Sequence, residues 1–170
     1  MCVTWKTNIL EFNKSLNLDE AKLPRGIHVL NPFKGDFKER INATATEFYE
    51  KYYNDTNERK LILGINPGRL GAGSTGIPFS DTKRLSQFCN IHVHEFSSHE
   101  PSSEFVYMLI EAFGGSEKFY SDFFISSVCP LGFTIDSKSG KTVNYNYYDS
   151  RPLEDAVLPF IIESIEKQLD

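Results

Sequence analysis

The sequence is poor in cysteine and contains no long apolar run. Its three cysteines, Cys2, Cys89 and Cys129, lie far apart, and no two of them form a CxxC pair. This pattern is typical of reduced thiols and gives no basis for a disulfide framework. No stretch reaches the ~20 apolar residues of a membrane span, and the first ten residues lack the pattern of a signal peptide. We therefore expect a cytoplasmic protein that makes no contact with a membrane.

An excess of basic residues is also missing. The chain has 18 Lys and Arg against 23 Asp and Glu, which gives a formal net charge of -5. Proteins that coat nucleic acid are usually basic, so this charge argues against broad phosphate coverage but leaves room for a small basic face. What is present is 40% hydrophobic and 14% aromatic residues in a chain of 170. This composition predicts one folded domain, residues 1–170, with its own core.

Helical and strand patterns alternate along the chain. We expect helices up to about residue 23, over residues 41–53, 83–89 and 104–113, and from 150 to 169 with a kink or break at Pro159. Short apolar runs that end at Gly or Pro predict buried strands at 61–65 and 123–128, with a weaker strand at 27–33. The fold class is therefore α/β, a three-layer αβα domain with a central, mainly parallel sheet. Two convincing core strands are fewer than a sheet usually has, so we expect the domain to be C-terminally incomplete.

The stretch LILGINPGRLGAGSTGIPFSD, residues 61–81, begins with the buried strand 61–65 and contains five glycines. Its residues 71–76 match the GxGxxG pattern of dinucleotide sites. Glu95 follows this motif at about the sequence separation at which such sites place the acidic residue that contacts the ribose. However, Pro78 falls where the helix of such a site should already run. A phosphate-binding P-loop is excluded because no Lys follows Gly76. A second interpretation is a glycine-rich connection without any ligand.

A third interpretation is a pocket for a nucleobase. Glycines let the main chain approach a flat ligand closely. Phe79 offers a base a stacking surface, and Asn66 at the strand end can hold a water in one orientation. The position after a buried parallel strand is where α/β sheets place their ligands, which favours a site over a bare connection.

The same residues resemble a known family. Residues 64–68 (GINPG) followed by 75–79 (TGIPF) are similar to the first motif of the uracil-DNA glycosylase superfamily, most of all to its single-strand-selective monofunctional (SMUG) branch, which has GMNPG and TGVPF at the same interval. Residues 128–131 (VCPL) resemble the NxCPL segment of that family. Together with PLGF and NYNYYD, these motifs look closest to the second, bacterial SMUG-like subfamily, over at least residues 61–149.

The resemblance implies a role for each matched residue. Asn66 would position the hydrolytic water, Phe79 would stack on the flipped base, and the main chain around residues 65–73 would shape the pocket floor. The base-binding residues that we expect are Ile65, Pro67, Gly68, Gly73, Phe79, Ser127, Asn144 and Asn146. Ser127 stands where the family has an Asn that reads the pyrimidine, so either Asn144 or Asn146 takes over this contact or the base selectivity differs.

The resemblance further implies the reaction. The chain would be a monofunctional DNA glycosylase of base excision repair, a monomer without cofactor or metal, that hydrolyses uracil or another deaminated base from DNA in the bacterial cytosol or nucleoid. The family's second motif is a late His-Pro segment, and none of the four histidines precedes Pro. We therefore expect the missing C-terminal strands to carry this His, and this chain to have little activity. The alternative is a non-catalytic nucleic-acid-binding or damage-sensing module on the same fold.

Other polar clusters carry weaker predictions. His92, His94, Glu95 and His99 could suggest a metal, but alternation would place the first two on one face of an exposed strand, which favours solvent-exposed histidines. The tyrosines within residues 145–148 could line a DNA groove or pack in the core. Four cations flank the proposed pocket and could touch DNA phosphates: Arg69, Lys83, Arg84 and Lys141.

Overall fold

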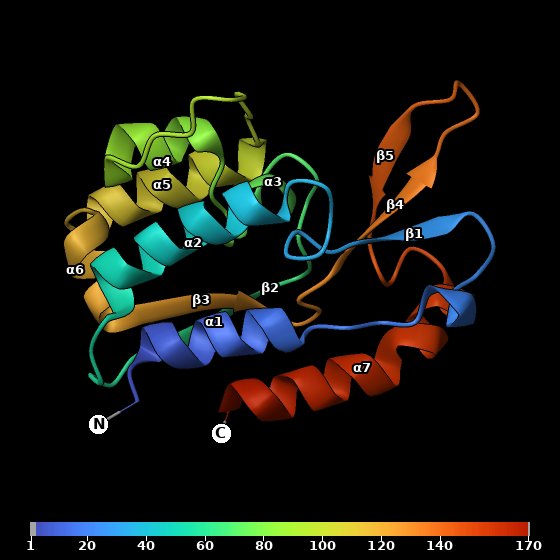
Figure 1. Cartoon of the computed structure of the whole chain (residues 1–170), viewed down its shortest axis with the longest axis horizontal. Helices are drawn as coiled ribbons and strands as arrows, with labels where there is room; N and C mark the ends of the chain where they lie inside the picture. The colour runs from blue at the N-terminus through green and yellow to red at the C-terminus, as the bar shows by residue number, and fades with distance from the viewer. Residues whose placement is uncertain (1–2, 170) are drawn as a thin grey trace.

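The computed structural model describes residues 3–169. In chain order its elements are α1 (Trp5–Ser15), η1 (Glu20–Lys22), β1 (Ile27–Leu30), α2 (Lys38–Tyr53), β2 (Lys60–Gly64), α3 (Ala72–Thr75), α4 (Thr82–Cys89), α5 (Pro101–Phe113), α6 (Ser116–Asp122), β3 (Phe123–Ser127), β4 (Gly132–Asp136), β5 (Thr142–Tyr145) and α7 (Arg151–Leu169). Within the described residues, no helix is long and apolar enough to cross a membrane. The chain is thus a mixed α/β protein (Figure 1).

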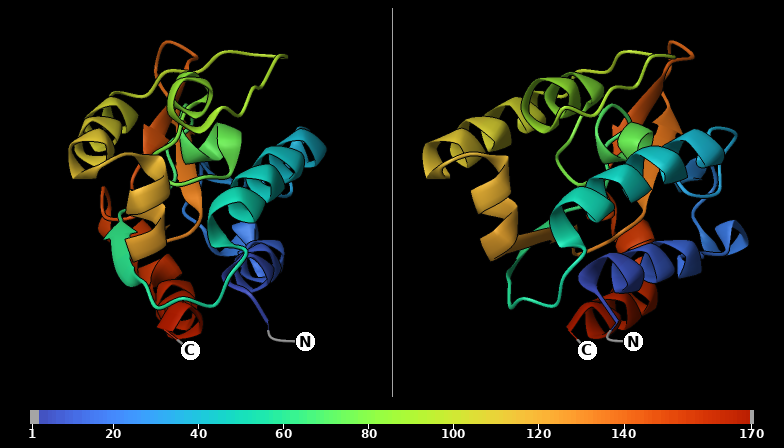
Figure 2. Two further views of the ribbon diagram at one scale, coloured as in Figure 1. Left: turned by 90° about the vertical axis from the view of Figure 1, so that its left-hand side faces the viewer. Right: turned by 60° about the vertical axis from the view of Figure 1, so that its left-hand side comes forward.

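The two predicted core strands, β2 and β3, pair in parallel, with Gly64 opposite Ser127. Helices α4 and α5 lie on one side of this pair and α7 lies on the other (Figures 1 and 2). The larger apolar core packs β3 against the helices and is rich in aromatic side chains, among them Phe48, Tyr53 and Phe124. The carboxyl ends of both strands point towards the second sheet, so the loops that follow them meet between the two sheets (Figure 1).

The second sheet is antiparallel, with strand order β1-β4-β5. The prediction of one central, mainly parallel sheet is therefore wrong for residues 3–169, in which β2 and β3 form a separate two-stranded sheet. Only five residues connect β4 to β5, and a connection this short can join antiparallel strands but not parallel ones. The sequence did not predict β5 because its residues are mostly exposed and form no apolar run. A smaller core, which includes Phe133, Leu153 and Val157, joins this sheet to α7.

Several element boundaries also differ from the prediction. The first helix ends at Ser15 rather than near residue 23, because Asp19 accepts a hydrogen bond from the Ala21 N–H and starts a separate 3-10 turn. Helix α6 was not predicted. Helix α7 continues through Pro159 without ending there.

The described cysteines are two free thiols, Cys89 and Cys129, and both are buried; Cys2 lies outside the described residues. Burial raises the pKa of the Cys129 thiol to about 12. A thiol that stays protonated at neutral pH is a poor nucleophile. Cys129 therefore contributes to packing and offers no reactive group.

Arg59, just before β2, holds the aromatic core to the start of the parallel sheet. Its guanidinium group is almost fully buried. It donates to the carbonyl oxygens of Tyr52 (3.0 Å) and Tyr120 (2.8 Å) and to both carboxylate oxygens of Asp55 (2.7 and 2.8 Å). These hydrogen bonds hold the pKa of the Asp55 carboxyl below its usual 3.8.

We expect Asp55→Asn to lower the melting temperature at pH 7 by roughly 3–6 °C, a cost of about 1–2 kcal/mol, because Arg59 loses its anion. The cost stays modest because the Asp55 side chain is 37% exposed and partly screened by water. Since folding lowers the Asp55 pKa, its stabilisation is complete above the unfolded pKa of ~3.9 and is lost as the pH falls through the folded value. Melting curves from pH 7 to pH 2 should therefore converge for the two chains. Glu58→Gln is the control, and a difference that persists at pH 2 would contradict the ion pair.

Candidate active site

The parallel strand pair fixes the start of the site. Past Gly64 the pairing continues, since Val128 N–H donates to the Gly64 carbonyl (2.9 Å) and Cys129 N–H donates to the Ile65 carbonyl (3.0 Å). Asn66 is therefore the first residue after the last paired carbonyl. The paired strands therefore set the direction of the backbone at Asn66, and a sheet is a rigid support for a functional side chain.

The amide of Asn66 is only half satisfied. Its Nδ2 donates to the Pro67 carbonyl at 3.3 Å. Its Oδ1 is buried, and no partner for it is found among residues 3–169. Leaving a buried acceptor unpaired costs ~1–3 kcal/mol, and such groups in native proteins often mark a bound water or a catalytic role. This oxygen can therefore accept a hydrogen bond from a water or a ligand.

Phe79 lies against the end of β2 in an unusual backbone conformation. Its φ is 52°, in the left-handed region that L-residues other than Asn and Asp rarely adopt. The ring fills the space above Gly64, where an added Cβ would lie 2.7 Å from the ring. Thr75 holds the turn, since its hydroxyl accepts from the Ile77 N–H (3.2 Å) and donates to the Ser80 carbonyl (2.7 Å). The glycine and the turn together fix the plane of the ring.

The glycine-rich loop folds back on itself. The N–H groups of Gly71 and Gly73 both donate to the Gly68 carbonyl (3.3 and 2.9 Å). The four-residue α3 follows and ends at Gly76, which has a φ of 74°. A dinucleotide site needs a long helix that opens at the motif, whereas here the last glycine of GxGxxG ends a short one. The loop thus does not form the nucleotide cradle of the first interpretation.

A cavity of about 50 Å³, enough for a few water molecules, lies at this place. Six of the residues predicted for the site line it: Ile65, Asn66, Pro67, Gly68, Phe79 and Ser127. Ala72, which lies within the predicted floor segment 65–73, also lines it, and three further lining residues were not predicted: Pro78, Glu100 and Ser102. The structure thus brings the amide, the aromatic ring and the buried Ser127 into one cavity.

Glu100 is the functional candidate that sequence reasoning missed. An added Cβ on Gly71 would lie 1.9 Å from the Glu100 Oε2, and one on Gly68 would lie 2.4 Å from its Oε1. The carboxyl group is therefore packed directly against the two glycines. Burial raises the pKa of the Glu100 carboxyl, and the nearby Asp81 adds to this effect. No local pattern points to Glu100, because it stands 34 positions after Asn66 in a polar loop.

The remaining predicted base contacts lie elsewhere. The Asn144 Oδ1 accepts from the Arg69 N–H at 2.9 Å, so this amide braces the glycine loop from β5. Asn146 lies in a turn in which its N–H donates to Asp149. Gly73 packs against Leu30. None of the three predicted residues, Gly73, Asn144 and Asn146, lines the cavity.

The prediction that Arg84 could touch DNA phosphates is wrong. Arg84 is 4% exposed. It donates to Asp81 (3.4 Å), pairs with Glu104 (3.0 Å) and lies 2.7 Å from the His99 Nδ1. Asp81 caps α4 by accepting from the Arg84 N–H, and Glu104 on the neighbouring helix α5 encloses the Arg84 guanidinium group. The other three predicted cations, Arg69, Lys83 and Lys141, are exposed.

The histidine cluster does not converge on a metal position. His92 and His94 stack with ring centroids 6.1 Å apart, and His99 bonds to Arg84. Within the described part of the chain, no three His, Cys, Asp or Glu side chains are placed to hold a metal ion. Of the tyrosines near β5, Tyr145 and Tyr147 pack against the smaller core and Tyr148 is 48% exposed.

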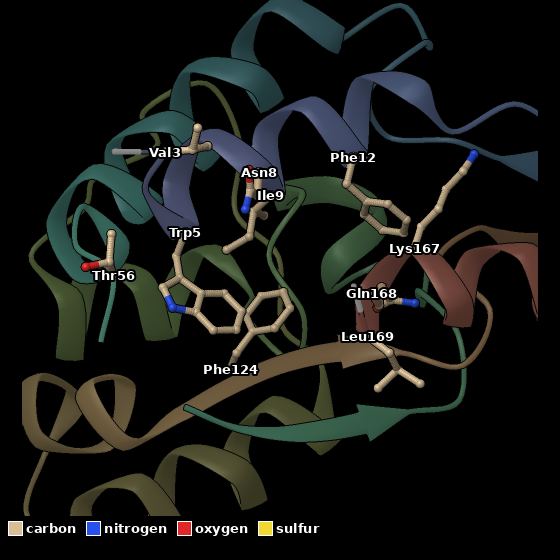
Figure 3. Close-up of a pocket in the computed structure, with 10 residues that line it drawn as sticks. All are labelled: Val3, Trp5, Asn8, Ile9, Phe12, Thr56, Phe124, Lys167, Gln168 and Leu169. Carbon is tan, nitrogen blue, oxygen red and sulfur yellow. The ribbon is translucent and has the colours of Figure 1, made fainter. Parts of the chain in front are cut away.

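A larger cavity, about 390 Å³, lies between α1 and the end of α7, over β3 (Figure 3). Its walls include Trp5, Phe12 and Phe124, with Leu169 at the end of α7 (Figure 3). None of the predicted site residues lines it. The larger cavity is therefore separate from the one at Asn66.

Two comparisons with known proteins give matches for this chain. The family model described as the uracil DNA glycosylase superfamily matches residues 50–170. The chain is also similar to the crystal structure of wild-type SMUG2 from Pedobacter heparinus, with 54% sequence identity and a TM-score of 0.93, over 99% of this chain and 71% of that chain. No curated protein sequence gives a significant match.

Proposed function

The chain belongs to the uracil DNA glycosylase superfamily, and we propose that it is a monofunctional DNA glycosylase that hydrolyses the N-glycosidic bond of uracil or another deaminated base. The observation that carries this proposal is the Asn66 amide, whose Oδ1 is buried without a partner among the residues that the structure describes and which lines the same cavity as the Phe79 ring. DNA is then the substrate, and the chain acts in base excision repair as a monomer in the bacterial cytosol or nucleoid, with no cofactor.

Hydrolysis begins when the damaged base leaves the DNA stack. This costs a few kcal/mol, and less for a mismatched or single-stranded base. The flipped base stacks on Phe79, and the Asn66 Oδ1 accepts a hydrogen bond from the attacking water. As the glycosidic bond breaks, positive charge develops on the deoxyribose and negative charge on the departing base. An amide is a weak base, but it can orient water towards an oxocarbenium-like centre that needs little deprotonation.

The surface charges fit a small DNA contact. Arg69 follows the lining residue Gly68 directly and is exposed, as are Lys83 and Lys141. We propose that these three cations bind phosphates on the flanking nucleotides, which positions the strand but does not read its sequence. With a net charge of -5, the chain should show only a shallow salt dependence of DNA binding.

We further propose that in a longer chain another strand pairs with β2 and extends the two-stranded parallel sheet. Ile62 and Leu63 on β2 are 36% and 38% exposed, Phe105 and Met108 on α5 are 68% and 67% exposed, and Ile162 on α7 is 50% exposed. A parallel strand is normally covered on both faces. The chain corresponds to 71% of the SMUG2 chain, and none of its four histidines precedes Pro. We therefore expect slow base release by the 170 residues alone.

The proposal is tested by a single-turnover assay, with protein in excess over oligonucleotides that carry uracil, hypoxanthine or xanthine. Abasic sites are detected by strand cleavage in alkali, and the undamaged oligonucleotide is the control. Release of any of these bases supports a glycosylase. Specific binding without release, also by a chain extended beyond residue 170, would instead favour a damage-sensing module.

Phe79 offers a separate test of the base pocket. We expect Phe79→Ala to weaken binding of a uracil-containing strand by ~10–100-fold, because stacking contributes ~1–3 kcal/mol per base. Phe79→Tyr keeps the ring and should bind as the unchanged chain does. A 2′-fluoro substituent on the uridine slows cleavage, so that affinity can be measured by fluorescence anisotropy. Equal affinity of the alanine and tyrosine variants would show that Phe79 does not stack on the base.

A further inference from the structure

Glu100 places a carboxyl group inside the cavity that holds Asn66 and Phe79. Its oxygens occupy space that any side chain at position 71 or 68 would fill, with distances of 1.9 and 2.4 Å to the added Cβ atoms. Glycine at both positions is therefore needed for the carboxyl group to reach this place. A half-buried carboxyl group over a glycine-lined floor is costly unless it has a partner.

Hydrogen bonds to neighbouring residues hold the loop that carries Glu100. The Glu100 N–H donates to the Asp81 Oδ2 at 2.8 Å, and Asp81 is fully buried while it caps α4. The Ser103 hydroxyl donates to the Glu100 Oε2 at 3.3 Å. Asp81 follows Phe79 by two residues, so the same short segment supports both the ring and the carboxyl group. Such support from neighbouring groups is what a binding residue needs to keep its geometry.

The other polar lining side chains are less suited to read the edge of a base, and the function proposed above assigns the free Asn66 Oδ1 to the attacking water. The Asn66 Nδ2 is engaged with Pro67, and Asn144 and Asn146 do not line the cavity. Ser127 lines it with a hydroxyl group, which offers a single donor. Glu100 is the lining residue with two side-chain oxygens that can accept hydrogen bonds from a ligand.

We propose that Glu100 determines base specificity by accepting a hydrogen bond from the ring N–H that deaminated bases carry. This proposal rests on the glycosylase function proposed above. Deamination turns the N3 acceptor of cytosine into the N3–H donor of uracil, and the N1 acceptor of adenine into the N1–H donor of hypoxanthine. Cytosine and adenine would instead place a lone pair against the carboxyl oxygen. The contact therefore distinguishes the product of deamination from its parent base by one proton.

The hydrogen bond from the ring N–H can form in both ionisation states of Glu100. An ionised carboxylate accepts through both oxygens, and a protonated one keeps acceptor capacity beside its O–H donor. Burial raises the Glu100 pKa, which favours the protonated form, and that form could also donate to a base carbonyl. Discrimination against a ring lone pair requires that an acceptor oxygen of Glu100, and not the O–H of the protonated form, faces the ring nitrogen.

The test compares two oligonucleotides that contain 2′-fluoro-2′-deoxyuridine, one with a free N3–H and one methylated at N3. The 170-residue chain should bind the N3–H strand at least ~10-fold more tightly, since methylation at N3 leaves the buried Glu100 acceptor unpaired. Glu100→Met should reduce this preference to within about twofold, because it keeps the length of the side chain but removes the strong acceptor. Glu100→Gln retains a carbonyl acceptor and should keep the preference. Glu104→Met, one turn further along α5 and outside the cavity, is the matched control.

Each outcome decides the proposal. Loss of the preference in Glu100→Met with retention in Glu100→Gln supports it. If Glu100 has only a structural role, Glu100→Met will weaken the binding of both strands equally and the preference will remain, which overturns the proposal. The proposal is also overturned if the unchanged chain shows no preference between the two strands. If the unchanged chain binds neither strand better than an undamaged one, the glycosylase proposal itself fails. Should Glu100→Met not fold, Glu100→Ala removes the carboxyl group without new contacts and gives the same comparison.

Discussion

Replacing Asn66 with alanine should slow base release by ~10²–10⁴-fold, because the attacking water is then no longer held in a reactive orientation. The reason is that the Asn66 amide is the lining group with a buried, unpaired acceptor, and alanine cannot orient a water. The rate is measured under single-turnover conditions on uracil-containing DNA. The same variant with 2′-fluoro-uridine DNA gives the affinity, which should change far less than the rate.

We also expect an effect of Asn66→Ala on the stability of the fold. Alanine removes a buried acceptor without a partner, which relieves ~1–3 kcal/mol, and loses the hydrogen bond to Pro67, which contributes ~0.5–1.5 kcal/mol. The melting temperature should therefore be unchanged or a few degrees higher, as is common where a site holds a strained or unsatisfied group for its function. A water bound at Oδ1 would bring the change closer to zero.

The control is Asn42→Ala, which makes the same chemical change on α2, where the Asn42 amide bonds only to the Lys38 carbonyl. This variant should release bases at the rate of the unchanged chain. Two results would count against the assigned role of Asn66. One is base release that survives the substitution, and the other is a loss of rate that is matched by unfolding of the variant.

Gly132→Ala should be strongly destabilising, by ~1–3 kcal/mol or a fall in melting temperature of roughly 3–10 °C. Gly132 opens β4, and an added Cβ would lie 2.3 Å from the carbonyl oxygen of Pro67 and 3.1 Å from Leu30. The first contact is with backbone, which cannot swing aside as a flexible side chain can. Either β4 or the segment after Asn66 must shift.

The same substitution should affect the site. Because Pro67 follows Asn66 directly, a displaced Pro67 carbonyl moves the amide that it holds, and a shift of ~1 Å in a catalytic group can cost ~10²-fold in rate. Gly35→Ala is the matched control, since the nearest atom to its added Cβ is the Asn31 carbonyl at 3.7 Å, an ordinary contact. Thermal melts and single-turnover rates are recorded for both variants. A Gly132→Ala chain as stable as Gly35→Ala would show that this close approach is absent in solution.

Some of the site could be predicted from local sequence. Asn66 and Phe79 flank one short loop at the end of one buried strand, so a glycine-rich connection of 12 residues is enough to bring them together. Strand positions 61–65 and 123–128 followed from apolar runs that end at Gly or Pro, and β2 and β3 confirm them within a residue or so. The resemblance to the uracil-DNA glycosylase superfamily rested on these same segments, and it is confirmed.

Other features have no local signal. The polar residues 142–145 form the exposed edge strand β5 because β4 offers them a partner, and not because of their own pattern. Arg84 resembles a surface cation until Asp81 and Glu104 enclose it. Side chains such as these take their role from partners that the tertiary structure supplies.

The sequence by itself determined the family, the parallel strands and the pairing of Asn66 with Phe79, because each depends on residues close together in the chain. Only the tertiary structure decided that the sheet divides in two, that Arg84 is buried and that Glu100 enters the cavity. The physical reason is that hydrophobic periodicity and glycine conformations act over a few residues. The position of the Glu100 carboxyl group depends instead on a hydrogen bond to Asp81 and on space left by two glycines about 30 residues earlier in the chain.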